Sequence, residues 1–372
     1  MKNKFLELDK SSWILTKLGD LAKNISKRVD NPSESEYDRF VGLENFVSGD
    51  IKIKNWVTTE NLASAAKAFQ AGDILFARRN AYLRRASLVD FDGCCSGDAF
   101  VLRENHDEVV PGFLAFLLNS NSLWNFANSN AAGTMSKRVK WEDLAEYEFL
   151  LPPKDQQAEI AELLWSIDEV IQKEFALTSK LRIAREASFF DLVSKNSGIE
   201  MPLSEVLVLK KSKSQSPHDR EKYIGLEHVQ SGAFTCDEFS SSAEVSSQLN
   251  LVDLGDLCYS KLRPYLDKAF IATFDAVSTT ELLIYQSKGV SKEYLLHHMH
   301  SRPFIEFVSG KGFGTKMPRI SHKIIGEYKV KVLDDEQTVI SAMKKIMITE
   351  DELRRKNCLS KALLNSLINE MF

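Results

Sequence analysis

The fold of this chain is decided by a stretch that occurs twice: GDILFARRNAYLRRA at residues 72–86 and GDLCYSKLRPYLDKA at residues 255–269. The two copies lie 183 positions apart, and the same spacing relates further pairs of residues on both sides of them. Those pairs are Gly42-Leu43-Glu44 with Gly225-Leu226-Glu227, Gly49 with Gly232, and Phe91-Asp92 with Phe274-Asp275. A gapless register over roughly 50 residues indicates an internal duplication.

The duplication continues at a slightly shorter spacing. Gly133-Thr134 with Arg138 matches Gly314-Thr315 with Arg319 at 181, and Gln157-x-x-Ile160 matches Gln337-x-x-Ile340 at 180. In each copy, short apolar runs between turn residues predict strands, and apolar helical segments and a basic Gly-Thr loop follow. We therefore predict an α+β fold of two similar domains, each with a small, mainly antiparallel or mixed sheet, related by a pseudo-twofold axis.

A long amphipathic helix closes each copy. The first begins after Pro152-Pro153, because prolines stop the preceding segment and are accepted at a helix start. Apolar residues recur at a spacing of three and four from Ile160 to Ile183 and from Val339 to Met371. Forty helical residues span about 60 Å, more than one small domain needs. Either the two helices pair as an antiparallel coiled coil that separates two heads, or each packs on its own domain.

The predicted organisation is four consecutive segments. Residues 1–153 and 198–334 form the two domains, and residues 154–197 and 335–372 form the central and C-terminal helices.

The composition excludes several classes of protein. The chain has 372 residues, 44% of them hydrophobic, so disordered and low-complexity classes are excluded. No apolar run approaches the roughly 18 residues of a membrane span, and acidic residues stand where a signal peptide is apolar. Five cysteines without paired spacing favour a reducing compartment. We expect a cytoplasmic protein that does not enter a membrane.

The motifs of common enzymes are absent from the sequence. There is no P-loop, no Gly-x-Ser-x-Gly elbow and no Cys-x-x-Cys pair. The histidines His297, His298 and His300 lack the spacing of four that places two metal ligands on one helix face. We expect no catalytic residue, no metal site and no cofactor of its own, which favours a binding protein.

Local clusters of positive charge suggest what is bound. The net charge is −4, yet basic residues gather at a few loops, and local clustering decides nucleic-acid binding. Lys and Arg neutralise phosphates, while Arg and Asn read base edges. The candidate DNA-binding residues are Arg78, Arg79, Asn80, Tyr82, Arg84, Arg85, Lys137, Arg138, Lys261, Arg263, Tyr265, Lys311, Lys316 and Arg319. Alternatively, this segment is a solvated turn whose Tyr82 and Tyr265 pack in the core.

The ordered set of motifs, given twice, resembles the specificity (S) subunits of type I restriction–modification enzymes. The first copy has Leu18-Gly19-Asp20, Gly72-Asp73-Ile74-Leu75, Gly133-Thr134 with Arg138, and Pro152-Pro153 before Gln157-x-x-Ile160. The second has Leu203-Ser204-Glu205, Gly255-Asp256-Leu257, Gly314-Thr315 with Arg319, and Asp334 to Ile340 without the proline pair.

The resemblance implies a non-catalytic subunit that recognises double-stranded DNA. Each copy is then one target recognition domain that reads half of a split, asymmetric sequence. The long helices bind two methyltransferase (M) subunits, which carry S-adenosylmethionine, and restriction (R) subunits join them. A coiled-coil adaptor with two protein-binding heads and no DNA role is the alternative.

Overall fold

The structure, a computed structural model, describes residues 9–134, 136–314 and 317–372, and the chain forms two compact units. Unit 1 contains the described residues up to Phe175 together with Lys356–Phe372, and unit 2 is Ala176–Arg355. Each long helix is therefore shared between the units. This division differs from four consecutive segments, and the boundaries of those segments stay a prediction.

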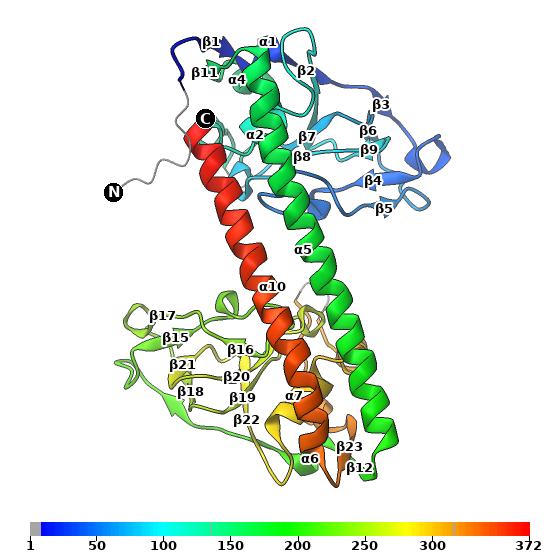
Figure 1. The fold of residues 1–372 in the computed structure, drawn as a ribbon, viewed down its shortest axis with the longest axis vertical. Helices are drawn as coiled ribbons and strands as arrows, with labels where there is room; N and C mark the ends of the chain where they lie inside the picture. The colour runs from blue at the N-terminus through cyan, green and yellow to red at the C-terminus, as the bar shows by residue number, and fades with distance from the viewer. Residues whose placement is uncertain (1–8, 135, 315–316) are drawn as a thin grey trace. The chain divides into compact units, whose positions relative to one another are not determined.

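Unit 1 is α+β and has three layers (Figure 1). The inner sheet has the order β2 (Ala22–Ile25), β10 (Ala99–Glu104), β7 (Ile74–Ala77), β8 (Ala86–Leu88). The outer sheet has the order β3 (Arg28–Val29), β6 (Ala66–Phe69), β9 (Gly93–Cys95), β4 (Arg39–Val41), β5 (Val57–Thr58). A separate pair joins β1 (Ile14–Lys17) and β11 (Glu148–Leu151). The short helices are α1 (Leu18–Leu21), α2 (Leu114–Leu117), α3 (Asn121–Ser129) and α4 (Trp141–Ala145).

The inner sheet of unit 1 is buried on both faces. Along β7, Ile74 and Phe76 face the helices, whereas Leu75 faces the outer sheet, as the two-residue period of a strand requires. Phe76 stacks on Trp124 of α3 with ring centroids 4.7 Å apart. Because both faces are covered, β7 is a continuous apolar run rather than an alternating one.

Unit 2 repeats these three layers. Its inner sheet is β13 (Leu207–Leu209), β22 (Leu282–Ser287), β19 (Leu257–Ser260), β20 (Ala269–Ala272), β16 (Thr235–Cys236). Its outer sheet is β14 (Lys213–Ser214), β18 (Leu249–Val252), β21 (Ala276–Ser278), β15 (Lys222–Ile224), β17 (Ser240–Ser241), and a separate pair joins β12 (Gly198–Pro202) and β23 (Lys329–Leu333). The short helices are α6 (Leu203–Val206), α7 (Lys292–Met299), α8 (Arg302–Gly310) and α9 (His322–Gly326). Two similar α+β domains are thereby confirmed.

The long helices are α5 (Lys154–Lys195) and α10 (Glu336–Met371). Within each unit, one half of α5 and one half of α10 run side by side in opposite directions (Figure 1). In unit 1, the Asn357 side chain donates to the Ile171 carbonyl at 2.8 Å. In unit 2, Arg185 and Glu350 form an ion pair at 2.8 Å, with both side chains buried. The predicted antiparallel pairing holds within each unit.

Each helix pair also packs on the core of its unit. In unit 1, Ile160 and Leu164 of α5 and Leu367 and Ile368 of α10 join the core beneath the inner sheet. Within each unit the helices therefore pair with each other and also pack on the core. Among the described residues, neither these helices nor any shorter one is long and apolar enough to cross a membrane.

The two long helices begin differently. Helix α5 starts directly after Pro153, as predicted, whereas at α10 the Asp335 carboxylate accepts hydrogen bonds from the N–H groups of Gln337 and Thr338. Asp335 is therefore an N-cap that replaces the proline pair.

The expected match of Gln157 with Gln337 is wrong. The Gln157 side chain accepts a hydrogen bond from the N–H of Val110 at 2.9 Å. In unit 2, Glu336 accepts the equivalent bond from the N–H of Ser291 at 2.7 Å, while Gln337 is exposed. Because the second helix starts without prolines, its residues are shifted by one position from the alignment that the two sequences suggest.

Candidate nucleic-acid interface

In each unit the predicted basic segment is the loop between two antiparallel strands of the inner sheet. It joins β7 to β8 in unit 1 and β19 to β20 in unit 2. A single 3-10 turn forms its centre, and a left-handed residue stands on each side of the turn. These residues are Asn80 (φ 56°) and Arg84 (φ 48°) in unit 1, and Arg263 (φ 50°) and Asp267 (φ 50°) in unit 2. A left-handed backbone costs a non-glycine residue roughly 1–2 kcal/mol, so the surrounding structure must hold the loop in this shape.

The predicted Gly-Thr loop comes directly against this segment. In unit 1, the N–H of Asn80 donates to the Lys137 carbonyl and the N–H of Val139 donates to the Arg78 carbonyl, both at 2.9 Å. In unit 2, Arg263 and Ile320 donate in the same way to Pro318 and Lys261, at 2.7 and 2.9 Å. We call the combined surface the basic junction: residues 78–85 with 136–139 in unit 1, and residues 261–268 with 317–320 in unit 2. The sequence did not show that these two segments meet.

A carboxylate that the sequence analysis missed lies against each junction. In unit 1, Arg138 donates from Nε and Nη2 to the two oxygens of Asp98, at 2.8 and 3.2 Å. In unit 2, Arg319 donates to both oxygens of Glu281 at 3.2–3.4 Å. These hydrogen bonds from Arg138 are the main cause that lowers the pKa of Asp98. Asp98 and Glu281 are themselves 183 positions apart, so a search of the repeat for paired acids could have found them.

The other predicted residues of unit 1 differ in how freely they face solvent. Arg78 and Arg79 are partly exposed and lie 3.9 and 3.7 Å from Asp98, and Arg79 also donates to Ser136 at 2.6 Å. Arg84 is exposed and donates to Asn121 at 2.5 Å, and Lys137 is exposed.

Arg85 points into unit 1 rather than out of it. Its Nη1 and Nη2 donate to the carbonyls of Leu43 and Arg79, at 2.9 and 3.1 Å. Lys268, the repeat counterpart of Arg85, donates to the carbonyl of Leu226 at 2.6 Å, and Leu226 is the counterpart of Leu43. Burial lowers the pKa of both Arg85 and Lys268. This pair of side chains tethers the basic loop to the Gly-Leu-Glu turn in both units.

The remaining predicted residues of unit 2 are spread more widely. Lys261 is partly buried and Arg263 is exposed. Lys311 precedes the junction, forms an ion pair with Glu327 at 2.8 Å and lies 4.4 Å from the ring centre of Phe307. Lys316 lies outside the described residues.

The two loop tyrosines are on the surface. Tyr82 is 67% exposed and Tyr265 is 52% exposed, and the leucine that follows each one is exposed as well. The alternative in which these tyrosines pack in the core is therefore wrong. An exposed aromatic ring can stack on a flat group of a partner, and the neighbouring arginines attract negative charge.

The histidines and cysteines that stand out in the sequence are buried. Among residues 9–134, 136–314 and 317–372, no three His, Cys, Asp or Glu side chains are grouped so that they could hold a metal ion. Cys94 and Cys95 lie in β9, and burial raises the pKa of their thiols to about 11 and about 12. Thiols with such a pKa are protonated at neutral pH and are weak nucleophiles.

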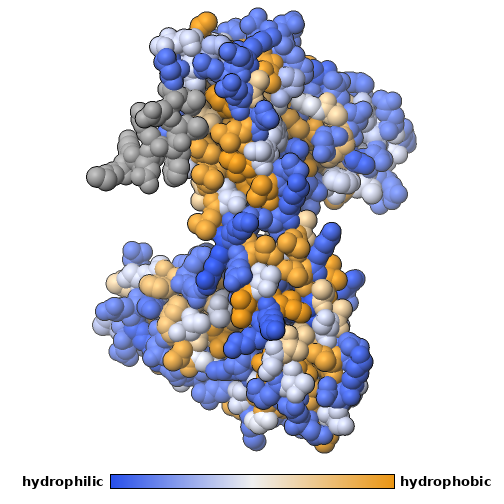
Figure 2. All heavy atoms as spheres, in the orientation of Figure 1, coloured by the Kyte–Doolittle hydropathy of each residue, from blue (hydrophilic) through white to orange (hydrophobic). Residues whose placement is uncertain are grey.

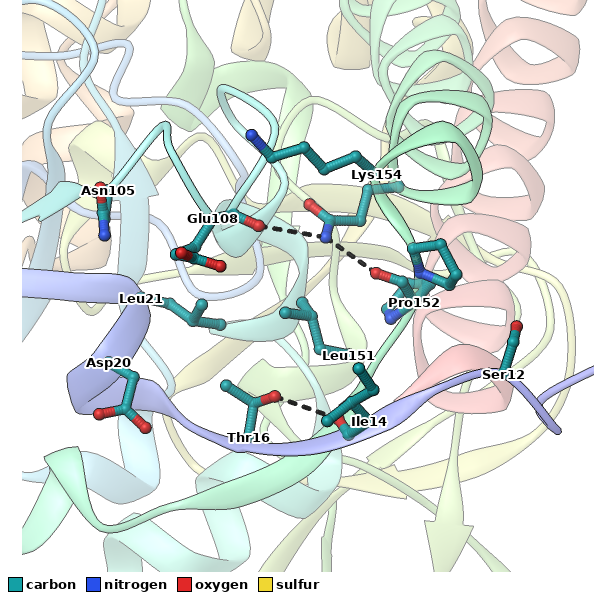
Figure 3. Close-up of a pocket in the computed structure, with 12 residues that line it drawn as sticks. Ser12, Ile14, Thr16, Asp20, Leu21, Asn105, Glu108, Leu151, Pro152 and Lys154 are labelled. Atoms are coloured by element: carbon teal, nitrogen blue, oxygen red, sulfur yellow. Dashed lines mark hydrogen bonds between the residues drawn. The ribbon is translucent and has the colours of Figure 1, made fainter.

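A pocket lies beside the start of α5 in unit 1, and the contacts at its edge stabilise the fold. Figure 3 shows its lining, which comes from β1, α1, β11, the start of α5 and the segment that precedes α2. At its edge the Gln157 amide donates to the carbonyls of Pro152 and Glu108, at 2.9 and 3.4 Å. Gln157 is buried and uses both ends of its amide to fix the start of α5, which explains its place in the motif.

The duplicated α+β fold thus defines a protein that presents two similar basic surfaces, one in each unit. Residues 10–181 match the family described as the type I restriction modification DNA specificity domain. The match lies in the first half of the chain and confirms the resemblance seen in the sequence.

Two curated relatives carry the same assignment. The chain is 26% identical over 162 residues to the type I restriction enzyme EcoDI specificity subunit of Escherichia coli, covering 42% of this chain and 36% of that protein. It is 25% identical over 191 residues to the HindI specificity subunit of Haemophilus influenzae, covering 48% and 40%. The matched stretches thus span less than half the length of each relative.

The likeness in fold extends over the whole chain. The crystal structure of a type I restriction–modification S subunit from M. genitalium aligns with a TM-score of 0.54 at 16% identity. The alignment covers 99% of this chain and 98% of that one. At this identity the match concerns the fold, and it includes the second copy, which lies outside residues 10–181.

Proposed function

We propose that this chain is the non-catalytic DNA specificity subunit of a type I restriction–modification complex. Each unit reads one half of a bipartite, asymmetric site in double-stranded DNA. The family match of residues 10–181 supports this function over the alternative, an adaptor with two protein-binding heads.

The observation that carries the proposal is the basic junction, which is built from the same two loops in both units. Arg78, Arg79, Arg84 and Lys137 offer positive charge to phosphates in unit 1, and Lys261 and Arg263 do so in unit 2. Guanidinium and amide groups on a fixed loop can also form paired hydrogen bonds with base edges. Because the two loops differ in side chains, the two units would select different half-sites.

Partner subunits are the second part of the proposal. Two methyltransferase subunits would bind the long helices and supply S-adenosylmethionine, and restriction subunits would join them, so this chain needs no cofactor of its own. Apolar side chains on the helices that face solvent support such contacts: Leu163 and Val170 on α5, and Leu359 and Leu363 on α10. Figure 2 shows apolar atoms gathered over the C-terminal half of α10. A protein that binds DNA together with these partners would be located in the cytoplasm.

Selection from a library of random double-stranded DNA tests the proposal. The full chain should enrich duplexes that share two short conserved elements separated by a fixed gap, with affinity that falls steeply as salt rises. Enrichment of no sequence, together with salt-insensitive binding, would favour the protein adaptor instead. Addition of a type I methyltransferase subunit provides a second measurement, since methylation should require both elements.

A further inference from the structure

We propose that Asp98 and Glu281 are positioning residues for DNA recognition: each carboxylate fixes the arginine of the Gly-Thr loop against the basic loop of its unit. This inference rests on the proposed function and adds to it the groups that set sequence preference.

In unit 1, Asp98 joins three parts of the junction. Its backbone carbonyl accepts a hydrogen bond from the N–H of Arg78 at 3.0 Å, and its carboxylate accepts two from Arg138. Arg79 lies 3.7 Å from the same carboxylate. The acid therefore touches the beginning of the basic loop and the arginine of the second loop at once.

Unit 2 builds the same arrangement with different side chains. The carbonyl of Glu281 accepts from the N–H of Lys261 at 3.0 Å, and its carboxylate holds Arg319. The backbone of Arg319 in turn pairs with that of Leu262, as Arg138 pairs with Arg79 in unit 1. Two different acids serve one geometry, so the carboxylate itself, rather than a particular side-chain length, is what the site requires.

A negative charge in this place weakens the attraction to phosphates, so it must contribute something else. Asp98 and Glu281 are each less than one-quarter exposed, and each holds its arginine through two nitrogens. A guanidinium has five N–H donors in a fixed plane, so the bidentate contact sets the direction of those left over. A guanidinium with a fixed direction can distinguish base edges, whereas a free one is attracted to any phosphate.

Removing the carboxylate should therefore affect the preference for the cognate half-site and the affinity for unrelated DNA differently. Removing the carboxylate leaves the arginine and its charge in place but frees its direction. The preference for the cognate half-site should fall about tenfold, the range of one lost base contact. Binding to unrelated DNA should be kept or strengthened, because one negative charge has been removed near the phosphates.

The test uses the full chain and duplexes selected by the wild-type protein, each with one half-site intact and the other randomised. Asp98→Asn should reduce preference only for the half-site read by unit 1, and Glu281→Gln only for the other. Asp98→Glu places in unit 1 the acid that unit 2 already uses. Unlike Asp98→Asn, this variant should keep the preference for the half-site read by unit 1. Thermal unfolding of every variant is measured alongside.

Each result decides between the possibilities. If the wild-type chain selects no sequence, the proposed function fails. If the wild-type chain selects a site and Asp98→Asn keeps full preference, the positioning role fails while the function stands. Equal loss of specific and non-specific binding would also overturn it, since that pattern describes a residue that only maintains the loop. If Asp98→Asn unfolds unit 1, the Asp98→Glu variant decides: a folded Asp98→Glu protein that has lost the wild-type preference overturns the positioning role, because a carboxylate is still present.

Discussion

The two basic loops share a backbone but differ in chemistry. Both have a 3-10 turn between two left-handed residues, and both are tethered by an inward cation, Arg85 or Lys268. At the second left-handed position, however, unit 1 has the exposed Arg84, whereas unit 2 has the buried Asp267. Asp267 accepts a hydrogen bond from Arg182 of α5 at 2.6 Å and lies 2.7 Å from Nδ1 of His300. One loop shape can therefore present charge outward or anchor itself to a long helix.

The largest expected difference between the units is their response to acid. In unit 2, burial is the main cause that lowers the pKa of His297 and of His298 to about 3, and at His297 the charge of Arg185 contributes to this shift. Their counterparts in unit 1 at a spacing of 181 are Phe116 and Leu117, which do not titrate. Below the ordinary histidine pKa of about 6.5, the unfolded state takes up protons that the folded state refuses.

Unit 2 should therefore lose stability between about pH 6.5 and 3, by roughly 1.4 kcal/mol per pH unit for each histidine. Denaturant titrations at pH 7 and pH 5 measure this, with His298→Leu as the control, since it removes one proton-binding group. If wild type and variant show the same dependence on pH, these histidines do not distinguish the units.

The second prediction concerns the anchor at the loop end. Asp267→Ala leaves His300 without its carboxylate in the core of unit 2 and Arg182 without an ion pair. We expect a loss of about 3 kcal/mol in the free energy of unfolding, as for a broken buried ion pair. The matched variant Arg84→Ala in unit 1 should cost less than about 0.5 kcal/mol, because Arg84 is exposed. Equal losses for the two variants would mean that the loops are anchored alike.

The third prediction compares the two junctions as DNA-binding surfaces. Replacing Arg78 and Arg79 by alanine should weaken binding at one half-site, and replacing Lys261 and Arg263 should weaken binding at the other. Each lost base contact costs about 1–3 kcal/mol, measured by titration of duplexes with one half-site intact. Lys173→Ala, which removes an exposed lysine on α5, serves as the control. Should either double variant affect both half-sites equally, the units do not read DNA independently.

The smallest effect on stability is expected at the loop tips. Tyr82→Ala and Tyr265→Ala should each change the free energy of unfolding by less than about 0.5 kcal/mol, because both rings are exposed. If the rings contact DNA, each variant lowers affinity for its own half-site alone. A large drop in stability would instead show that the tip packs on its unit.

Local patterns in the sequence predicted most of the fold. The constant spacing predicted two similar domains, and Pro152-Pro153 predicted where α5 begins. The spacing is found by comparing the chain with itself, and the proline signal acts within a few residues, so a single sequence is enough to read both. The capping role of Asp335 was missed because the absence of prolines hid the register of α10.

Less of the candidate site could be predicted, because its key contacts join distant segments. Arg85 reaches a carbonyl 42 residues earlier, and Arg138 reaches a carboxylate 40 residues earlier. Charge and spacing identified both arginines as basic surface residues, but neither signal states what a side chain will meet after folding. Only the paired acids Asp98 and Glu281, visible through the duplication, offered a clue in the sequence alone.

The inward tether has a consequence for changing the specificity of this protein by design. Because Arg85 holds the loop of unit 1 through its inward-pointing side chain, the exposed residues of that loop can vary while the loop keeps its shape. A library that varies positions 78, 79, 82 and 84, while keeping Asn80, Ala81 and Arg85, would sample new surface chemistry on a constant backbone. The native loop of unit 2 shows that the same backbone also accepts Arg263 and Pro264 at the places of Asn80 and Ala81, so grafting residues 261–264 onto residues 78–81 extends the library to those two positions.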